Sequence, residues 1–131
     1  MDNLIGFDLF LDGYLDCAQW SSPLYTEDTD GNLISDDNLE GYYFSEKALE
    51  ALTEECCTFY KEYYDLISEF IDKANTNMAG AGHDFWLTRN GHGAGFWDRG
   101  AGIVGQILTD YADTFGSLDL MLNSDNEIII A

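Results

Sequence analysis

Apolar residues recur at helical spacing in three segments of the chain, and the polar residues between them fall on the opposite sides. These segments are residues 5–19, 45–74 and 101–115, and each is predicted to form an amphipathic helix. Ser45 is placed to cap the first turn of the middle segment. At 1.5 Å per residue this segment predicts one continuous rod of about 43 Å. The predicted core includes Leu49, Leu52, Phe59, Ile67, Ile107, Leu108 and Tyr111.

Two further segments have the pattern of β-hairpins. Asn90-Gly91 lies between apolar residues and is a strong signal for a two-residue turn, so residues 84–98 are predicted to be a hairpin. Residues 118–130 predict a second hairpin, whereas the acidic segment 21–44 predicts a loop with little regular structure. We therefore expect a single α+β domain over residues 1–131, with helices packed on a small antiparallel sheet and a C-terminal β-β-α-β-β arrangement.

The stretch from His83 to Gly100 concentrates unusual residues, because it holds both histidines, both arginines and two of the three tryptophans. The predicted hairpin explains its aromatic residues and glycines, since large side chains then face small ones across the strands. It does not require polar residues to gather near the turn. Turn tips are commonly polar, so both a structural role and a binding role stay open. The candidate binding residues of this stretch are Arg89, Asn90, His92, Trp97 and Arg99.

Charge is the strongest global property of the sequence. The chain has 25 acidic and 5 basic residues, for a formal net charge of −20. Residues 1–79 hold 18 of the acids and three lysines, while residues 80–105 are neutral. Such a charge disfavours direct contact with nucleic acid or an anionic membrane and favours a basic partner.

The acidic residues of the two N-terminal predicted helices repeat at helical spacing. Carboxylates four residues apart recur about every 6 Å along a helix, and such a row resembles the spacing of phosphates along duplex DNA. The candidate binding residues on this face are Asp8, Asp12, Asp16, Glu50, Glu54, Glu62, Asp65 and Glu69.

Catalytic and metal-binding patterns are weak, and we predict no catalytic residue, no cofactor and no required metal. His83 and His92 could act as an acid and a base, but the predicted hairpin places them about 30 Å apart. The acidic stretch at 26–40 partly resembles a calcium loop around Asp28, Asp30 and Gly31, and cation binding there stays open. Three cysteines without metal spacing, and no recognisable signal peptide, indicate a reducing cytoplasm.

The sequence "AGHDFWLTRNGHGAGFWDRG", followed by a helix and an acidic hairpin, resembles a group of small acidic proteins encoded by tailed phages, mostly of uncharacterised function. The resemblance runs from about Ala79 to the end of the chain. It implies a phage origin and a setting in the cytoplasm of an infected bacterium.

Together with the charge, this resemblance leads us to expect an accessory protein that inhibits a host nucleic-acid-handling or defence protein of the restriction or CRISPR type, by acidic DNA mimicry. The partner would be a basic protein surface, with no direct nucleic acid and no membrane. Two alternatives remain, a small-ligand binder or enzyme that uses the stretch from His83 to Arg99, and an interaction module that uses the aromatic hairpin.

Overall fold

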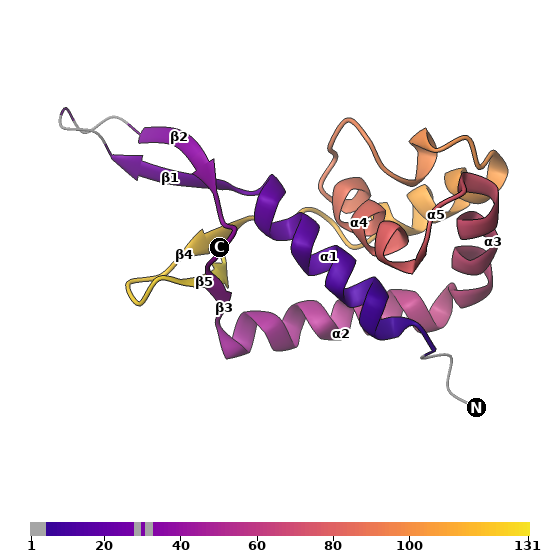
Figure 1. Cartoon of the computed structure of the whole chain (residues 1–131), viewed down its shortest axis with the longest axis horizontal. Coiled ribbons are helices and arrows are strands. Elements are labelled where there is room, and N and C mark those ends of the chain that lie inside the picture. Colours follow the sequence, from indigo (N-terminus) through magenta and orange to yellow (C-terminus); the bar gives the residue numbers. More distant parts are fainter. Residues whose placement is uncertain (1–4, 28–29, 31–32) are drawn as a thin grey trace.

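The computed structural model describes residues 5–27, 30 and 33–131 and confirms the α+β fold class, with helices in the majority (Figure 1). The helices are α1 (Phe7–Ser21), α2 (Glu46–Glu62), α3 (Tyr64–Ala74), α4 (Met78–Arg89), a short 3-10 helix η1 (Phe96–Asp98) and α5 (Ile103–Asp113). The strands are β1 (Pro23–Glu27), β2 (Leu33–Asn38), β3 (Tyr43–Phe44), β4 (Leu120–Leu122) and β5 (Glu127–Ile130). The helices predicted over 5–19 and 101–115 are therefore confirmed as α1 and α5.

The strands form two separate sheets. β1 and β2 pair antiparallel as a two-stranded ribbon that extends away from the end of α1 (Figure 1). The second sheet has the order β3-β5-β4, in which β4 and β5 form the predicted C-terminal hairpin and β3 lies parallel to β5. Two expectations are corrected here. The segment 21–44 contains strands, and the second sheet is mixed because β3 joins it in place of residues 84–98.

The predicted hairpin over residues 84–98 is wrong, because most of it is helix α4 and the remainder is a loop with η1. The β-β-α-β-β arrangement is therefore corrected to a helical region followed by β4 and β5. Asn77 caps α4 by accepting a hydrogen bond from the Gly80 backbone N–H at 2.8 Å, so the helix begins at Met78, before the start of the predicted hairpin. Every residue of α4 from Asp84 to Arg89 is buried. A helix buried on nearly all sides lacks the apolar periodicity that identifies a surface helix.

The Asn90-Gly91 pair ends this helix instead of turning a hairpin. Gly91 adopts a φ of +68°, and its N–H donates to the Thr88 carbonyl at 3.1 Å. The next N–H, of His92, donates to the Leu87 carbonyl at 3.0 Å. These two bonds are the Schellman pattern of a helix C-terminus, which also requires a residue with positive φ. Gly91 therefore provides the left-handed residue that the C-terminus of α4 requires, and not the one that a hairpin turn would require.

The predicted helix over 45–74 is interrupted at Tyr63, and α3 turns away from α2 (Figure 1). Tyr63 has a φ of −117° and a ψ of 23°, outside helical values. The Ser45 cap is confirmed, since its Oγ accepts a hydrogen bond from the Ala48 N–H at 3.1 Å. The expected rod of about 43 Å is corrected to two helices, of which α2 spans about 25 Å at 1.5 Å per residue.

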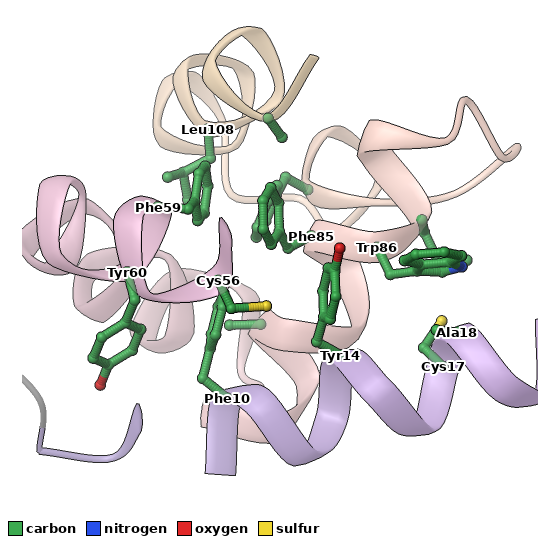
Figure 2. Close-up of a cluster of buried hydrophobic side chains, with 14 of the residues drawn as sticks. Phe10, Tyr14, Cys17, Ala18, Cys56, Phe59, Tyr60, Phe85, Trp86 and Leu108 are labelled. Carbon is green, nitrogen blue, oxygen red and sulfur yellow. The ribbon is translucent and has the colours of Figure 1, made fainter. Parts of the chain in front are cut away.

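The core lies where α1, α2, α4 and α5 converge, and it is rich in aromatic rings (Figure 2). Phe59 and Phe85 stack at its centre, with ring centroids 4.0 Å apart. The core prediction is confirmed for four residues that are fully buried, Leu52, Phe59, Ile67 and Leu108. It is wrong for three others: Leu49 and Tyr111 are 39% and 40% exposed, and Ile107 is half-buried. Tyr111 instead stacks on Tyr63 near the surface, at a centroid distance of 4.2 Å.

Helices α1 and α4 cross at unusually short range because each presents a glycine to the other. A Cβ atom on Gly13 would lie 1.9 Å from the Ala79 carbonyl oxygen, and one on Gly82 would lie 1.9 Å from the Phe10 carbonyl oxygen. Neither distance is compatible with a side chain, so the crossing depends on both glycines. This close contact holds the helix that carries the unusual stretch directly against the first acidic helix.

Candidate functional site

Arg89, a candidate binding residue, lies inside the protein and is 3% exposed. Its guanidinium donates two hydrogen bonds to the Glu55 carboxylate, at 3.1 and 3.3 Å, and one to the Tyr14 hydroxyl at 3.2 Å. It also donates to the backbone carbonyls of Phe115 and Gly116, both at 2.8 Å, which follow the end of α5. Because these bonds engage all three nitrogens, the side chain holds α1, α2 and α5 around α4 and is not presented to a ligand.

Asn90 has a similar structural role at the end of α4. Its side-chain amide donates to the Trp86 carbonyl at 3.0 Å, and its Oδ1 accepts from the Leu118 backbone N–H at 2.7 Å. The Ser117 hydroxyl donates to the Arg89 carbonyl at 3.3 Å. Together these bonds fix the segment that leads into β4 against the C-terminus of α4.

Arg99 forms an ion pair with a buried carboxylate of α4. Asp84 is 3% exposed and accepts hydrogen bonds from Nε and Nη2 of Arg99, the shortest at 2.7 Å. The Arg99 side chain keeps 36% of its surface exposed. This pair ties the loop after η1 to α4 and gives a buried carboxylate a partner of opposite charge.

His83 precedes Asp84 in α4 and is half-buried. Its ring packs against Trp20, with centroids 5.4 Å apart. Partial burial lowers the pKa of His83 below its ordinary value of 6.5, and the nearby Asp84 carboxylate opposes this effect only in part. The described contacts place no nucleophile beside His83, and the two histidines lie on different elements, α4 and the loop that follows it.

Of the five candidate binding residues in this stretch, His92 and Trp97 are exposed and take part in no ion pair of the described residues, whereas the exposed Arg99 is paired with Asp84. Trp97 is 49% exposed, and His92 is exposed at the rim of a cavity of about 540 Å³. The cavity lies between the end of α1, the end of α4 and the start of the C-terminal hairpin. It is lined by Ser21, Ser22, Pro23, Trp86, Asn90, His92, Ser117, Leu118, Asp119, Leu120, Met121 and Ala131.

The buried thiols and phenols are not arranged for nucleophilic chemistry. Burial raises the pKa of the Cys17 thiol to about 12 and also raises the pKa of Cys56, so both stay protonated at neutral pH. Burial likewise raises the pKa of Tyr14. Within residues 5–27, 30 and 33–131, no group of three or more His, Cys, Asp and Glu side chains could hold a metal ion. The calcium-loop alternative at 26–40 depends on Asp28 and Gly31, which lie outside the described residues.

The eight acidic candidates are all exposed, in contrast to Arg89. On α1 the carboxylates of Asp8, Asp12 and Asp16 lie opposite the buried side that packs on α4. On α2 the exposed acids are Glu50, Glu54 and Glu62, and on α3 they are Asp65 and Glu69. We call these eight residues the acidic set.

The break at Tyr63 changes how the acidic set is arranged. Helix α3, which contains Asp65 and Glu69, turns away from α2 (Figure 1), so the row of acids on α2 ends at Glu62. Among the ion pairs of the described residues, the acidic set takes part in one, between Glu69 and Lys73 at 3.9 Å. The other seven carboxylates are exposed and take part in no ion pair with the residues that the structure describes.

No protein family, curated protein or solved structure matched this chain. None of the described helices is long and apolar enough to cross a membrane.

Sequence reasoning missed three residues at these sites. Glu55 is the partner of Arg89, and its position three residues after Leu52, on the apolar side of α2, was a detectable sign of a buried basic partner. Trp20 packs on His83, and Asp119 borders the cavity, but neither had a signal in the sequence because both contacts depend on the tertiary fold.

Proposed function

We propose that this protein binds a basic surface of another protein through the carboxylates of the acidic set. The observation that carries the proposal is the exposure of all eight carboxylates, together with the single ion pair among them in the described structure. The partner would be a host protein that otherwise holds nucleic acid, with the chain acting as a phage-encoded inhibitor of the restriction or CRISPR type.

The ion pairs of the two arginines support this proposal. Arg89 is buried and paired with Glu55, and the partly exposed Arg99 is paired with Asp84, so each arginine offsets its own partner and no member of the acidic set. The charge of −20 is therefore concentrated on the exterior, where it attracts a basic partner over distances near the Debye length.

The geometry of α1 and α2 supports partial mimicry of a polyanion. Asp8, Asp12 and Asp16 repeat every four residues, as do Glu50 and Glu54, which gives intervals of about 6 Å along each helix. A protein surface that grips phosphates with lysine and arginine would meet carboxylates at comparable intervals. Because α3 turns away, the proposed contact centres on α1 and α2.

The alternatives based on the stretch from His83 to Arg99 have less support. Arg89 and Asn90 are held by internal hydrogen bonds, so a ligand-binding role would require them to break these bonds. The hairpin on which the interaction-module hypothesis depended is replaced by α4.

The test uses a charge-neutralised variant and a control matched in charge. The variant carries Glu50→Gln, Glu54→Gln and Glu62→Gln, and the control carries Glu40→Gln, Asp113→Asn and Asp125→Asn, three exposed acids outside the acidic set. A partner is first captured from a bacterial host lysate at low salt. Association rates are then measured at about 50 and 300 mM salt, where the Debye length falls from roughly 14 to 6 Å.

We expect the α2 variant to associate about tenfold more slowly than wild type at low salt, and the control to be much less affected. The difference should shrink at high salt. Equal rates for the α2 variant and wild type would contradict the proposal, as would a partner whose binding does not weaken with salt.

A further inference from the structure

The outer edge of β4 carries backbone N–H and C=O groups that pair with no strand of the described residues. In the β4–β5 hairpin, the Ala131 N–H donates to the Asp119 carbonyl and the Asn123 N–H donates to the Glu127 carbonyl, both at 2.9 Å. Alternate residues of an antiparallel strand bond to the same neighbour. Positions 119, 121 and 123 therefore point their N–H and C=O groups at β5, and positions 118, 120 and 122 point theirs to the other side.

One of these outward groups is already capped. The Leu118 N–H is bound by the Asn90 side chain at 2.7 Å, which agrees with the outward direction of position 118. The N–H and C=O groups of Leu120 and Leu122 come next along the same edge. No strand of the described residues pairs with this edge, because β4 is the last strand in the order β3-β5-β4.

The cavity of about 540 Å³ lies along this edge. Leu118, Asp119, Leu120 and Met121 form one wall, and residues 21–23 at the junction of α1 and β1 form another. The polar side chains of Asn90 and Ser117 in the lining are engaged in bonds to the protein itself. The polar groups of the lining that are left for a ligand include the backbone of β4, the carboxylate of Asp119 and, at the rim, the imidazole of His92.

We propose that this groove, defined by the outer edge of β4 and residues 21–23, binds an extended basic segment of a partner protein as an added strand. Main-chain hydrogen bonds to Leu120 and Leu122 would provide the binding energy, and side chains at alternate positions would provide specificity. This inference concerns a surface separate from the acidic set and does not depend on the function proposed above.

Charge decides which strand fits the groove. Asp119 is exposed at its wall, and residues 106–131 contain five acids and no base. A lysine or arginine opposite Asp119 forms a favourable cross-strand pair, whereas an acidic residue there is repelled. A second copy of this chain would bring another charge of −20 to the same edge, so the occupant is a basic partner and not another copy.

The alternating directions of the side chains in β4 determine which residue types the partner's segment needs at each position. Leu120 is 8% exposed and faces the core, while Met121 is 48% exposed on the same face as Asp119. In an antiparallel added strand, the residue opposite Asp119 is basic and the residue two positions away, opposite Met121, is apolar. The residue between them pairs with the Leu120 backbone.

A peptide-binding experiment tests the groove directly. The probe is a fluorescently labelled seven-residue peptide of alternating lysine and valine, compared with an alternating glutamate and valine peptide and with a lysine–valine peptide in block order. The variant Asp119→Lys is compared with Asp125→Lys, which makes the same charge change at the β4–β5 turn outside the groove.

We expect the alternating basic peptide to bind wild type and Asp125→Lys, and its affinity to fall at least about tenfold for Asp119→Lys. Equal losses in the two variants would overturn the proposal, since they would indicate attraction to net charge alone. Absence of binding by the alternating basic peptide, or equal binding of the block peptide, would also overturn it.

Amide hydrogen exchange of the wild-type protein provides a readout that does not depend on the variants. In the free protein we expect the amides of Met121 and Asn123 to exchange slowly because they face β5, and the amides of Leu120 and Leu122 to exchange faster because they pair with no strand. Added peptide should slow exchange at Leu120 and Leu122. Protection of these two amides before peptide is added, together with a dimeric mass in sedimentation, would show that a second copy covers the edge and would overturn the proposal.

Discussion

At the scale of single residues, Arg89 joins α4 to α1, to α2 and to the segment that follows α5. Replacing it with methionine removes its bonds to Glu55, Tyr14 and the carbonyls after α5, and leaves a partly buried carboxylate without a base. We expect Arg89→Met to lower the free energy of unfolding by about 3–5 kcal/mol, as measured by chemical denaturation.

The matched control for this prediction is Lys73→Met. It breaks the ion pair with Glu69, in which both side chains are about half exposed. An exposed pair contributes less than about 1 kcal/mol, so this variant should be nearly as stable as wild type. Similar losses for the two variants would contradict the structural role given to Arg89.

His83 makes stability depend on pH in a defined direction. Because its pKa in the folded protein lies below the unfolded value of 6.5, the unfolded chain binds a proton more readily as the pH falls below 6.5. The contribution of His83 to stability is therefore complete above that value and declines as the pH falls through it toward the folded pKa. We expect wild type to lose stability relative to His83→Gln between about pH 7.5 and pH 5. A constant difference, or one that changes in the opposite direction, would contradict this.

At the scale of elements, the crossing of α1 and α4 should be sensitive to a single methyl group. Gly13→Ala and Gly82→Ala each place a Cβ against a backbone carbonyl of the other helix, so the helices must separate. Each is expected to cost about 1–3 kcal/mol of unfolding free energy, even though alanine favours helix more than glycine does. Gly93→Ala is the control, because a Cβ there meets nothing within 4 Å, and it should change stability by less than about 0.5 kcal/mol.

The elements that could be predicted from sequence are those with one apolar side. Helix α1, helix α5 and the β4–β5 hairpin each have one buried side, and their periodicity located them within about two residues. Helix α4 could not be found in this way, because it is buried from Asp84 to Arg89 and glycines occupy its contact with α1. The interruption at Tyr63 could not be predicted from the sequence either, because the apolar stripe continues past Tyr63 into α3.

The candidate sites also differ in how far the sequence could predict them. Exposure of the acidic set followed from helical spacing, because charged residues opposite an apolar stripe face solvent. The roles of Arg89 and Asn90 did not follow, since their partners Glu55 and Leu118 come from elements far away in the sequence. A cluster of rare residues in a short stretch can therefore indicate buried polar contacts within the fold as well as a binding site.

At the scale of the whole molecule, the uneven balance of charge predicts a response to salt. The repulsion among surface carboxylates opposes compactness, and added salt screens it. We expect the free energy of unfolding to rise between about 50 and 500 mM sodium chloride, and to rise less in the variant with Glu50→Gln, Glu54→Gln and Glu62→Gln. Stability that is independent of salt, or equally salt-dependent in both proteins, would contradict this account.

The packing of α1 on α4 also determines when the protein can fold. Tyr14 and Arg89, which bond to each other in the core, are 75 residues apart in the chain. Contacts of such separation require a long loop to close first, so folding should be slower than in helical proteins built from neighbouring helices. During synthesis at about 5–20 residues per second, α1 leaves the ribosome several seconds before its partner exists. Through that interval the α1 segment has no α4 to cover its apolar side, and Asp8, Asp12 and Asp16 are the charged groups that it presents to water.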